Sequence, residues 1–142
     1  FLIEIGGEII AKGINPVSKK KWKIGIRLPQ KGNENKFIQI RNIDDYAIAT
    51  SGNYNKFSID SLTGKKYVHS INPKNGIALN SNILSVSVIA PSCIAADAFA
   101  TALMVMPLNM GRKVVNENQK IEASWVISRN DDLVQIKSSG WD

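Results

Sequence analysis

The chain has 142 residues, 44% of them hydrophobic and 21% charged, with a formal net charge of +6. This length suits one domain with a hydrophobic core, and no apolar stretch is long enough to cross a bilayer. The single cysteine, Cys93, excludes a disulfide framework and a thiolate metal cluster. The lysines are scattered apart from a group at residues 19–23. Because they show no repeated pattern of interleaved aromatic residues, they do not indicate nucleic-acid binding.

The first third of the chain predicts β-strands separated by turn residues. Residues 1–12 predict a strand interrupted at Gly6-Gly7, where the glycines indicate a bulge or the close approach of a ligand. Glu8 follows, either as a surface residue or as a ligand-facing one. Alternating apolar residues predict further strands at 22–27, 36–41 and 46–50. Their regular spacing favours an antiparallel meander.

Two polar segments follow in the middle of the chain. The turn at 50–53 comes directly after a strand, so it is interpreted either as an anion site built from hydroxyls and backbone N–H groups or as an ordinary turn. A hairpin is expected with arms at 57–60 and 65–71. Its second arm carries His69, the only histidine. A lone histidine can be structural or catalytic, and both interpretations stay open.

Residues 93–106 predict a buried helix, because alanine, leucine and methionine favour helices. Ser92 is the expected N-cap, and Pro107 ends the helix. Asp97 and Thr101 are four residues apart and therefore share a helix face. A carboxylate on an apolar helix needs a neutralising partner. That partner is either Mg²⁺, which suits two oxygens one turn apart, or a lysine or backbone group.

The remaining elements complete the fold prediction. Strands are expected at 83–90, 121–128 and 133–137, with a second helix at 108–118. Antiparallel strands with a few packed helices indicate the α+β class.

Four stretches, in this order and at this spacing, resemble the C-terminal half of the ApbE family, the FAD:protein FMN transferases. They are Glu4-Ile5-Gly6-Gly7-Glu8-Ile9, Ala49-Thr50-Ser51-Gly52-Asn53-Tyr54, His69-Ser70-Ile71-Asn72-Pro73-Lys74-Asn75-Gly76 and Ala96-Asp97-Ala98-Phe99-Ala100-Thr101-Ala102-Leu103. The strand at 22–27 is also similar to that family. The resemblance implies that residues 1–142 form the C-terminal portion of one ApbE-like domain whose N-terminal part is absent. It also implies a T-fold-like architecture.

The resemblance implies a Mg²⁺-dependent enzyme that transfers FMN from FAD to a Ser or Thr of a target protein and releases AMP. The alternatives are an FAD pyrophosphatase that yields FMN and AMP, and a flavin-binding protein without turnover. The family is usually anchored to the membrane outside the cytoplasm, so a periplasmic lipoprotein with an upstream lipid anchor is expected. The isolated chain is expected to be inactive, because other parts of the flavin site belong upstream of Phe1.

Family position also suggests roles for particular residues. Asp97 and Thr101 correspond to metal ligands, and His69 is the best candidate for the base that deprotonates the acceptor hydroxyl. The residues expected to contact FAD are Glu8, Thr50, Ser51, Gly52, Asn53 and Ile71. The chain departs from the common family pattern at Asn72, Asn75 and Ala78, and at Ala100, which is acidic in some members.

Overall fold

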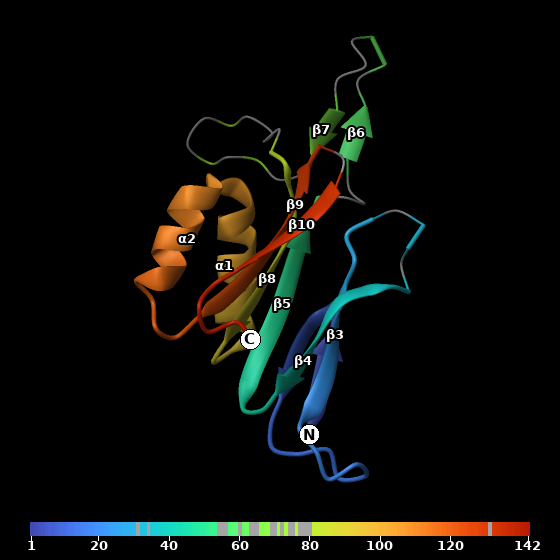
Figure 1. Cartoon of the computed structure of the whole chain (residues 1–142), viewed down its shortest axis with the longest axis vertical. Coiled ribbons are helices and arrows are strands. Elements are labelled where there is room, and N and C mark those ends of the chain that lie inside the picture. The colour runs from blue at the N-terminus through green and yellow to red at the C-terminus, as the bar shows by residue number, and fades with distance from the viewer. Residues whose placement is uncertain are drawn as a thin grey trace.

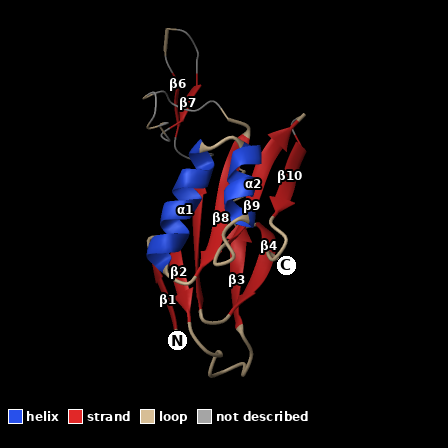
Figure 2. Ribbon diagram, turned by 90° about the vertical axis from the view of Figure 1, so that its left-hand side faces the viewer, coloured by secondary structure: helices blue, strands red, loops and turns tan. Residues whose placement is uncertain are grey.

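The chain forms three layers in the computed structural model, which describes residues 1–30, 32–33, 35–53, 57–59, 61–62, 66–68, 71, 73, 76, 81–130 and 132–142. Two helices cover one face of a six-stranded antiparallel sheet, and a two-stranded sheet lies on the other face (Figures 1 and 2). The α+β class expected from the sequence is therefore confirmed. No helix in the described ranges is long and apolar enough to span a membrane.

The elements follow the predicted segments closely. The strands are β1 (Leu2–Ile5), β2 (Glu8–Ala11), β3 (Trp22–Arg27), β4 (Phe37–Ile43), β5 (Tyr46–Gly52), β6 (Phe57–Ile59), β7 (Lys66–Val68), β8 (Ile83–Ala90), β9 (Glu122–Arg129) and β10 (Asp132–Lys137). The helices are α1 (Cys93–Val105) and α2 (Leu108–Asn116). The main sheet has the order β1-β2-β5-β8-β9-β10, so the expected meander is interrupted where β3 and β4 leave it to pair with each other.

Strand alternation divides the core between the two faces of the main sheet. On β5, Ala47 and Ala49 face the helices, whereas Ile48 faces the β3–β4 pair. Trp125 of β9 and Leu103 of α1 belong to the helix-side core, and both are fully buried. β8 is covered on both faces, which explains why seven of its eight residues are buried, Ser85 and Ser87 among them.

Helix α1 buries one stripe rather than its whole surface. Ser92 caps its N-terminus by accepting a hydrogen bond from the Ala95 backbone N–H at 3.3 Å, as predicted. The helix packs on β5 and β8, and its fully buried residues include Ala96, Ala100, Leu103 and Met104. The opposite stripe is open, because α1 lies near the side of the sheet where the β1–β2 hairpin ends (Figure 2). The helix expected to be buried is therefore buried along one stripe only.

Gly6 and Gly7 form a hairpin turn, not a bulge within one strand. Residues Ile5 and Glu8 pair across it, with φ of 68° at Gly6 and 109° at Gly7. Positive φ at both central residues defines the turn type that matches the twist of a two-residue hairpin, and glycine adopts it without strain. The turn ends β1 and β2 well before the neighbouring β5 ends.

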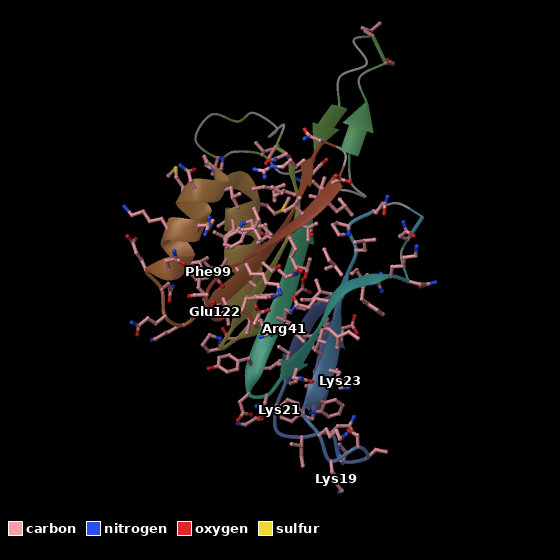
Figure 3. The ribbon with its side chains drawn as sticks, in the orientation of Figure 1. Lys19, Lys21, Lys23, Arg41, Phe99 and Glu122 are labelled. Atoms are coloured by element: carbon pink, nitrogen blue, oxygen red, sulfur yellow. The ribbon has the colours of Figure 1, made fainter. Side chains whose placement is uncertain are left out.

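The C-terminal tail closes the β3–β4 layer. Trp141 is fully buried, and its indole N–H donates to Gln39 Oε1 of β4 at 2.8 Å. The Arg41 guanidinium, labelled in Figure 3, lies 5.4 Å from the centroid of the same ring. At the chain end, the hydrogen bond from Lys137 lowers the pKa of Asp142 below its ordinary value. The tail thus fastens β4, and through it β3, to the main sheet.

Candidate functional site

A cavity of about 800 Å³ lies beside the β1–β2 turn, between β3, β5 and α1. Its polar side chains come from four separate segments of the chain: the β1–β2 hairpin, β3, the end of β5 and α1. The lining residues are Glu4, Gly6, Gly7, Glu8, Ile9, Ile24, Gly25, Ile26, Arg27, Ile48, Thr50, Ser51, Gly52, Ile71, Asp97, Thr101 and Val105. A volume of this size can hold a cofactor-sized ligand.

The early end of the hairpin exposes one edge of β5 to this cavity. The β2–β5 pairing stops at Ile9 opposite Ile48, whereas β5 continues to pair with β8 up to Gly52. Asn53 N–H donates to Leu84 O at 2.9 Å, which shows that the odd-numbered residues at this end of β5 direct their backbone N–H and C=O groups at β8. In that alternation the backbone groups of Thr50 and Gly52 point away from β8, towards the cavity side. These groups can bind an anion or another polar ligand.

Three oxygen-bearing side chains line the cavity where β5 approaches α1. Ser51 Oγ and Thr101 Oγ1 lie 3.1 Å apart in a hydrogen bond that links the strand to the helix. Asp97 lines the same cavity one helical turn before Thr101, and both side chains are exposed. No ion pair with Asp97 occurs within the described ranges. The lysine partner considered from the sequence is therefore not found among these residues.

These side chains suit a hard divalent cation. A carboxylate and hydroxyls offer the oxygen ligands that Mg²⁺ prefers, and an open cavity leaves room for water and substrate oxygens. The described residues contain no cluster of three or more His, Cys, Asp or Glu side chains. Among the described lining residues, Asp97 and Thr101 are therefore the pair that could bind a cation.

The remaining charges of the cavity are unevenly distributed. Glu4 and Glu8 come from the hairpin, and the Glu8 carboxylate leans back over the turn, 3.1 Å from where a Cβ on Gly6 would lie. Arg27 of β3 is the single cation among the described lining residues, and none of the ion pairs found there involves it. Its guanidinium can therefore bind a phosphate without first breaking an ion pair.

Seven of the nine residues predicted to form the site line this one cavity: Glu8, Thr50, Ser51, Gly52, Ile71, Asp97 and Thr101. Asn53 does not line it; that residue is only 5% exposed and continues the β5–β8 ladder. His69 lies outside the described residues, as do Asn72, Asn75 and Ala78. The roles proposed for Asn53 and His69 stay predictions.

Sequence reasoning missed the contribution of β3. Gly25 and Arg27 line the cavity because the β3–β4 pair crosses the face of the main sheet beside the hairpin. The alternating pattern predicted the strand and its outward-facing residues, but not which surface those residues would meet. Glu4 was also missed, although its place two residues before a glycine turn was a usable signal.

Comparison with known proteins gives this geometry a family context. The model of the ApbE family matches residues 1–125. The chain is 38% identical to the FAD:protein FMN transferase of Vibrio cholerae over 99% of its own length, and 32% identical to that of Haemophilus influenzae over 98%. It spans only 41% and 39% of these two relatives.

Solved structures of ApbE proteins have the same fold as this chain. The flavin transferase ApbE of Vibrio cholerae superposes with a TM-score of 0.78 at 35% identity, covering 99% of this chain and 42% of that one. The apo flavinyl transferase ApbE of Pseudomonas stutzeri gives a TM-score of 0.80 at 29% identity, with the same coverage of 99% and 42%. The sequence match extends over most of the chain and the fold match over nearly all of it. The chain therefore belongs to the ApbE family.

Proposed function

We propose that this chain supplies one wall of a flavin-transferase site, in which FMN passes from FAD to a Ser or Thr of a target protein. The observation that supports this most is the convergence of seven predicted residues, from four separate segments, on one cavity. The names of the relatives fit the same activity. Because the chain spans about two fifths of those relatives, residues 1–142 are proposed to be the C-terminal portion of the complete domain.

In this proposal Asp97 and Thr101 hold Mg²⁺, and the Ser51 hydroxyl fixes the position of Thr101. A bound Mg²⁺ would supply positive charge to the pyrophosphate oxygens and so make AMP a better leaving group. Asp97 contributes the negative charge that attracts the cation, and the hydrogen-bonded Ser51–Thr101 pair holds its oxygens in place before binding. Preorganised oxygens reduce the cost of ordering the site when FAD arrives.

The β5 edge and Arg27 would contact the phosphates. Backbone N–H groups at Thr50 and Gly52 are hydrogen-bond donors, and the Arg27 guanidinium adds a positive charge on the β3 side. Donors fixed in a strand lose little entropy on binding, so they stabilise developing oxygen charge efficiently. Ile71 provides an apolar contact for the flavin ring, and Glu8 offers an acceptor to the same ligand.

The reaction exchanges the phosphoanhydride bond within the FAD pyrophosphate for a phosphoester bond to the acceptor. The acceptor hydroxyl oxygen attacks the FMN phosphorus, a new O–P bond forms, and the bond between that phosphorus and the bridging oxygen breaks. AMP carries the bridging oxygen away. His69 is proposed to take the proton of the hydroxyl, because a side chain with a pKa near neutrality is best suited to general-base work.

Product analysis separates the proposal from its rivals. The complete domain is incubated with FAD, Mg²⁺ and a Ser/Thr-bearing target, and the target is examined by mass spectrometry. Covalent FMN on the target together with AMP supports transfer. Free FMN and AMP without target modification would indicate a pyrophosphatase instead, and bound FAD that stays intact would indicate a flavin-binding protein without turnover.

A location outside the cytoplasm is a further part of the proposal. Family resemblance favours an extracytoplasmic, lipid-anchored protein, and a lipid-modified residue upstream of Phe1 is the feature that would support it. Fractionation of cells that express the complete protein tests this, since a cytoplasmic soluble pool would contradict it.

A further inference from the structure

A basic surface lies at the end of the molecule opposite the cavity. The loop between β2 and β3, with Lys23 at the start of β3, forms what is here named the basic tip. It contains five lysines: Lys12, Lys19, Lys20, Lys21 and Lys23. Figure 3 places Lys19, Lys21 and Lys23 along this end of the molecule. None of these lysines is used by the proposed transfer chemistry.

The basic tip is held in one shape by its own hydrogen bonds. Asn15 Oδ1 accepts from the N–H groups of Val17 at 2.9 Å and Ser18 at 3.1 Å. The Asn15 backbone N–H donates to Lys20 O at 2.8 Å, and the Lys19 N–H donates back to Asn15 O at 2.9 Å. The loop therefore presents its side chains at fixed positions, and little conformational entropy is lost when it binds a surface.

Positive charge at the basic tip is largely uncompensated. Lys21 Nζ lies 3.7 Å from Asp44 Oδ2, and Asp45 accepts from the Gly13 N–H at 3.3 Å. No ion pair within the described part of the chain involves Lys20 or Lys23. These two lysines and Lys21 line an open pocket of about 620 Å³ whose described lining contains no carboxylate. Such a pocket suits a phosphate group.

Apolar side chains accompany the lysines. Val17, at the end of the loop, is 90% exposed, and Ile14 is 52% exposed. Two protruding aliphatic groups among lysines fit a bilayer surface, where the lysines meet anionic head groups and the aliphatic groups enter the interface. An acidic protein or a nucleic acid would account for the lysines but would leave Val17 in water.

We infer that the basic tip binds the surface of a bilayer rich in anionic phospholipids, with a head-group phosphate in the pocket lined by Lys20, Lys21 and Lys23. The cavity would then face away from the lipid. It lies at the far end of β5, and the strand from Tyr46 to Gly52 extends roughly 20 Å at ~3.3 Å per residue. This inference is independent of the transfer activity.

The test is sedimentation of the complete domain, prepared without a lipid anchor, with vesicles. Phosphatidylglycerol–phosphatidylcholine vesicles are compared with pure phosphatidylcholine at low and at physiological salt. The inference predicts binding to anionic vesicles that weakens as salt screens the charges. Replacing Lys20, Lys21 and Lys23 together by Gln should weaken it on the order of 100-fold, given ~1 kcal/mol per lysine near such a surface.

A matched control variant has the same net charge as the variant that lacks Lys20, Lys21 and Lys23. Replacing the exposed Lys36, Arg112 and Lys120 by Gln removes three positive charges elsewhere and should leave vesicle binding within a few-fold of the unmodified chain. Equal losses in both triple variants would overturn the inference, because they would show attraction to the net charge rather than to the basic tip. Circular dichroism melts of both variants confirm that they are folded.

Two further measurements identify the ligand. Val17→Asp should weaken vesicle binding, whereas Val17→Leu should preserve it. Inorganic phosphate at millimolar concentration should compete only weakly, because it lacks the surface that Val17 enters. Full competition by phosphate, or tight binding to soluble polyglutamate that is indifferent to Val17→Asp, would overturn the lipid assignment in favour of a free phosphate or an acidic protein.

Discussion

Replacing Trp141 by alanine tests how the cavity wall is supported. The side chain is fully buried in the core between the main sheet and the β3–β4 pair, and its indole N–H is bonded to Gln39. Removing a buried tryptophan costs about 3–5 kcal/mol of unfolding free energy. For a chain of this size that loss lowers the melting temperature by roughly 10–15 °C. Urea unfolding followed by circular dichroism measures it directly.

A conservative variant separates packing from hydrogen bonding. Trp141→Phe keeps most of the buried surface and loses the bond to Gln39, whose Oε1 still accepts from Gln135 Nε2 at 2.9 Å. Its cost should therefore be close to that of one hydrogen bond and a small cavity, about 1–2 kcal/mol. A loss below about 1 kcal/mol for Trp141→Ala would refute the docked tail and the support it gives to β3.

Three other substitutions probe the turn, the cavity charge and the tail. Gly6→Ala places a Cβ at positive φ beside the Glu8 carboxylate and should cost about 1 kcal/mol in urea unfolding, whereas a neutral effect would contradict the turn geometry. Arg27→Gln should weaken FAD binding by the complete domain about tenfold and reduce its salt dependence, as one lost charged hydrogen bond does. Unchanged affinity in a fluorescence titration would remove Arg27 from the phosphate site. Gly140→Ala places a Cβ against the Glu122 carboxylate and should lower the free energy of unfolding by about 1–3 kcal/mol. An unchanged free energy of unfolding would show that the tail adjusts freely.

Local patterns in the sequence predicted the elements well. The period-2 alternation of β3 and β8 and the proline before α2 specify these segments from neighbouring residues alone. The N-cap at Ser92 was equally local. The sequence did not predict the exposed stripe of α1, because an apolar helix has the same residue pattern whether a sheet covers all of it or only one stripe.

The site was predictable as a set of residues but not as a geometry. The ordered motifs pointed to Glu8, Asp97 and Thr101, whereas their spacing alone left a structural explanation open. Arg27 and the free edge of β5 depend on where the β1–β2 hairpin stops relative to β5. The docking of Trp141 on Gln39 likewise joins residues about a hundred positions apart. Patterns among neighbouring residues cannot predict contacts between residues so far apart in the sequence.

The most direct test of the proposed site is the linkage between Mg²⁺ and FAD. FAD affinity of the complete domain is measured by fluorescence titration with and without Mg²⁺, for the unmodified protein and for Asp97→Ala. Mg²⁺ is expected to tighten FAD binding several-fold in the unmodified protein and not in the variant, because both ligands share the cavity. The same Mg²⁺ effect in both proteins, or none in the unmodified one, would contradict the assignment of Asp97 to the metal.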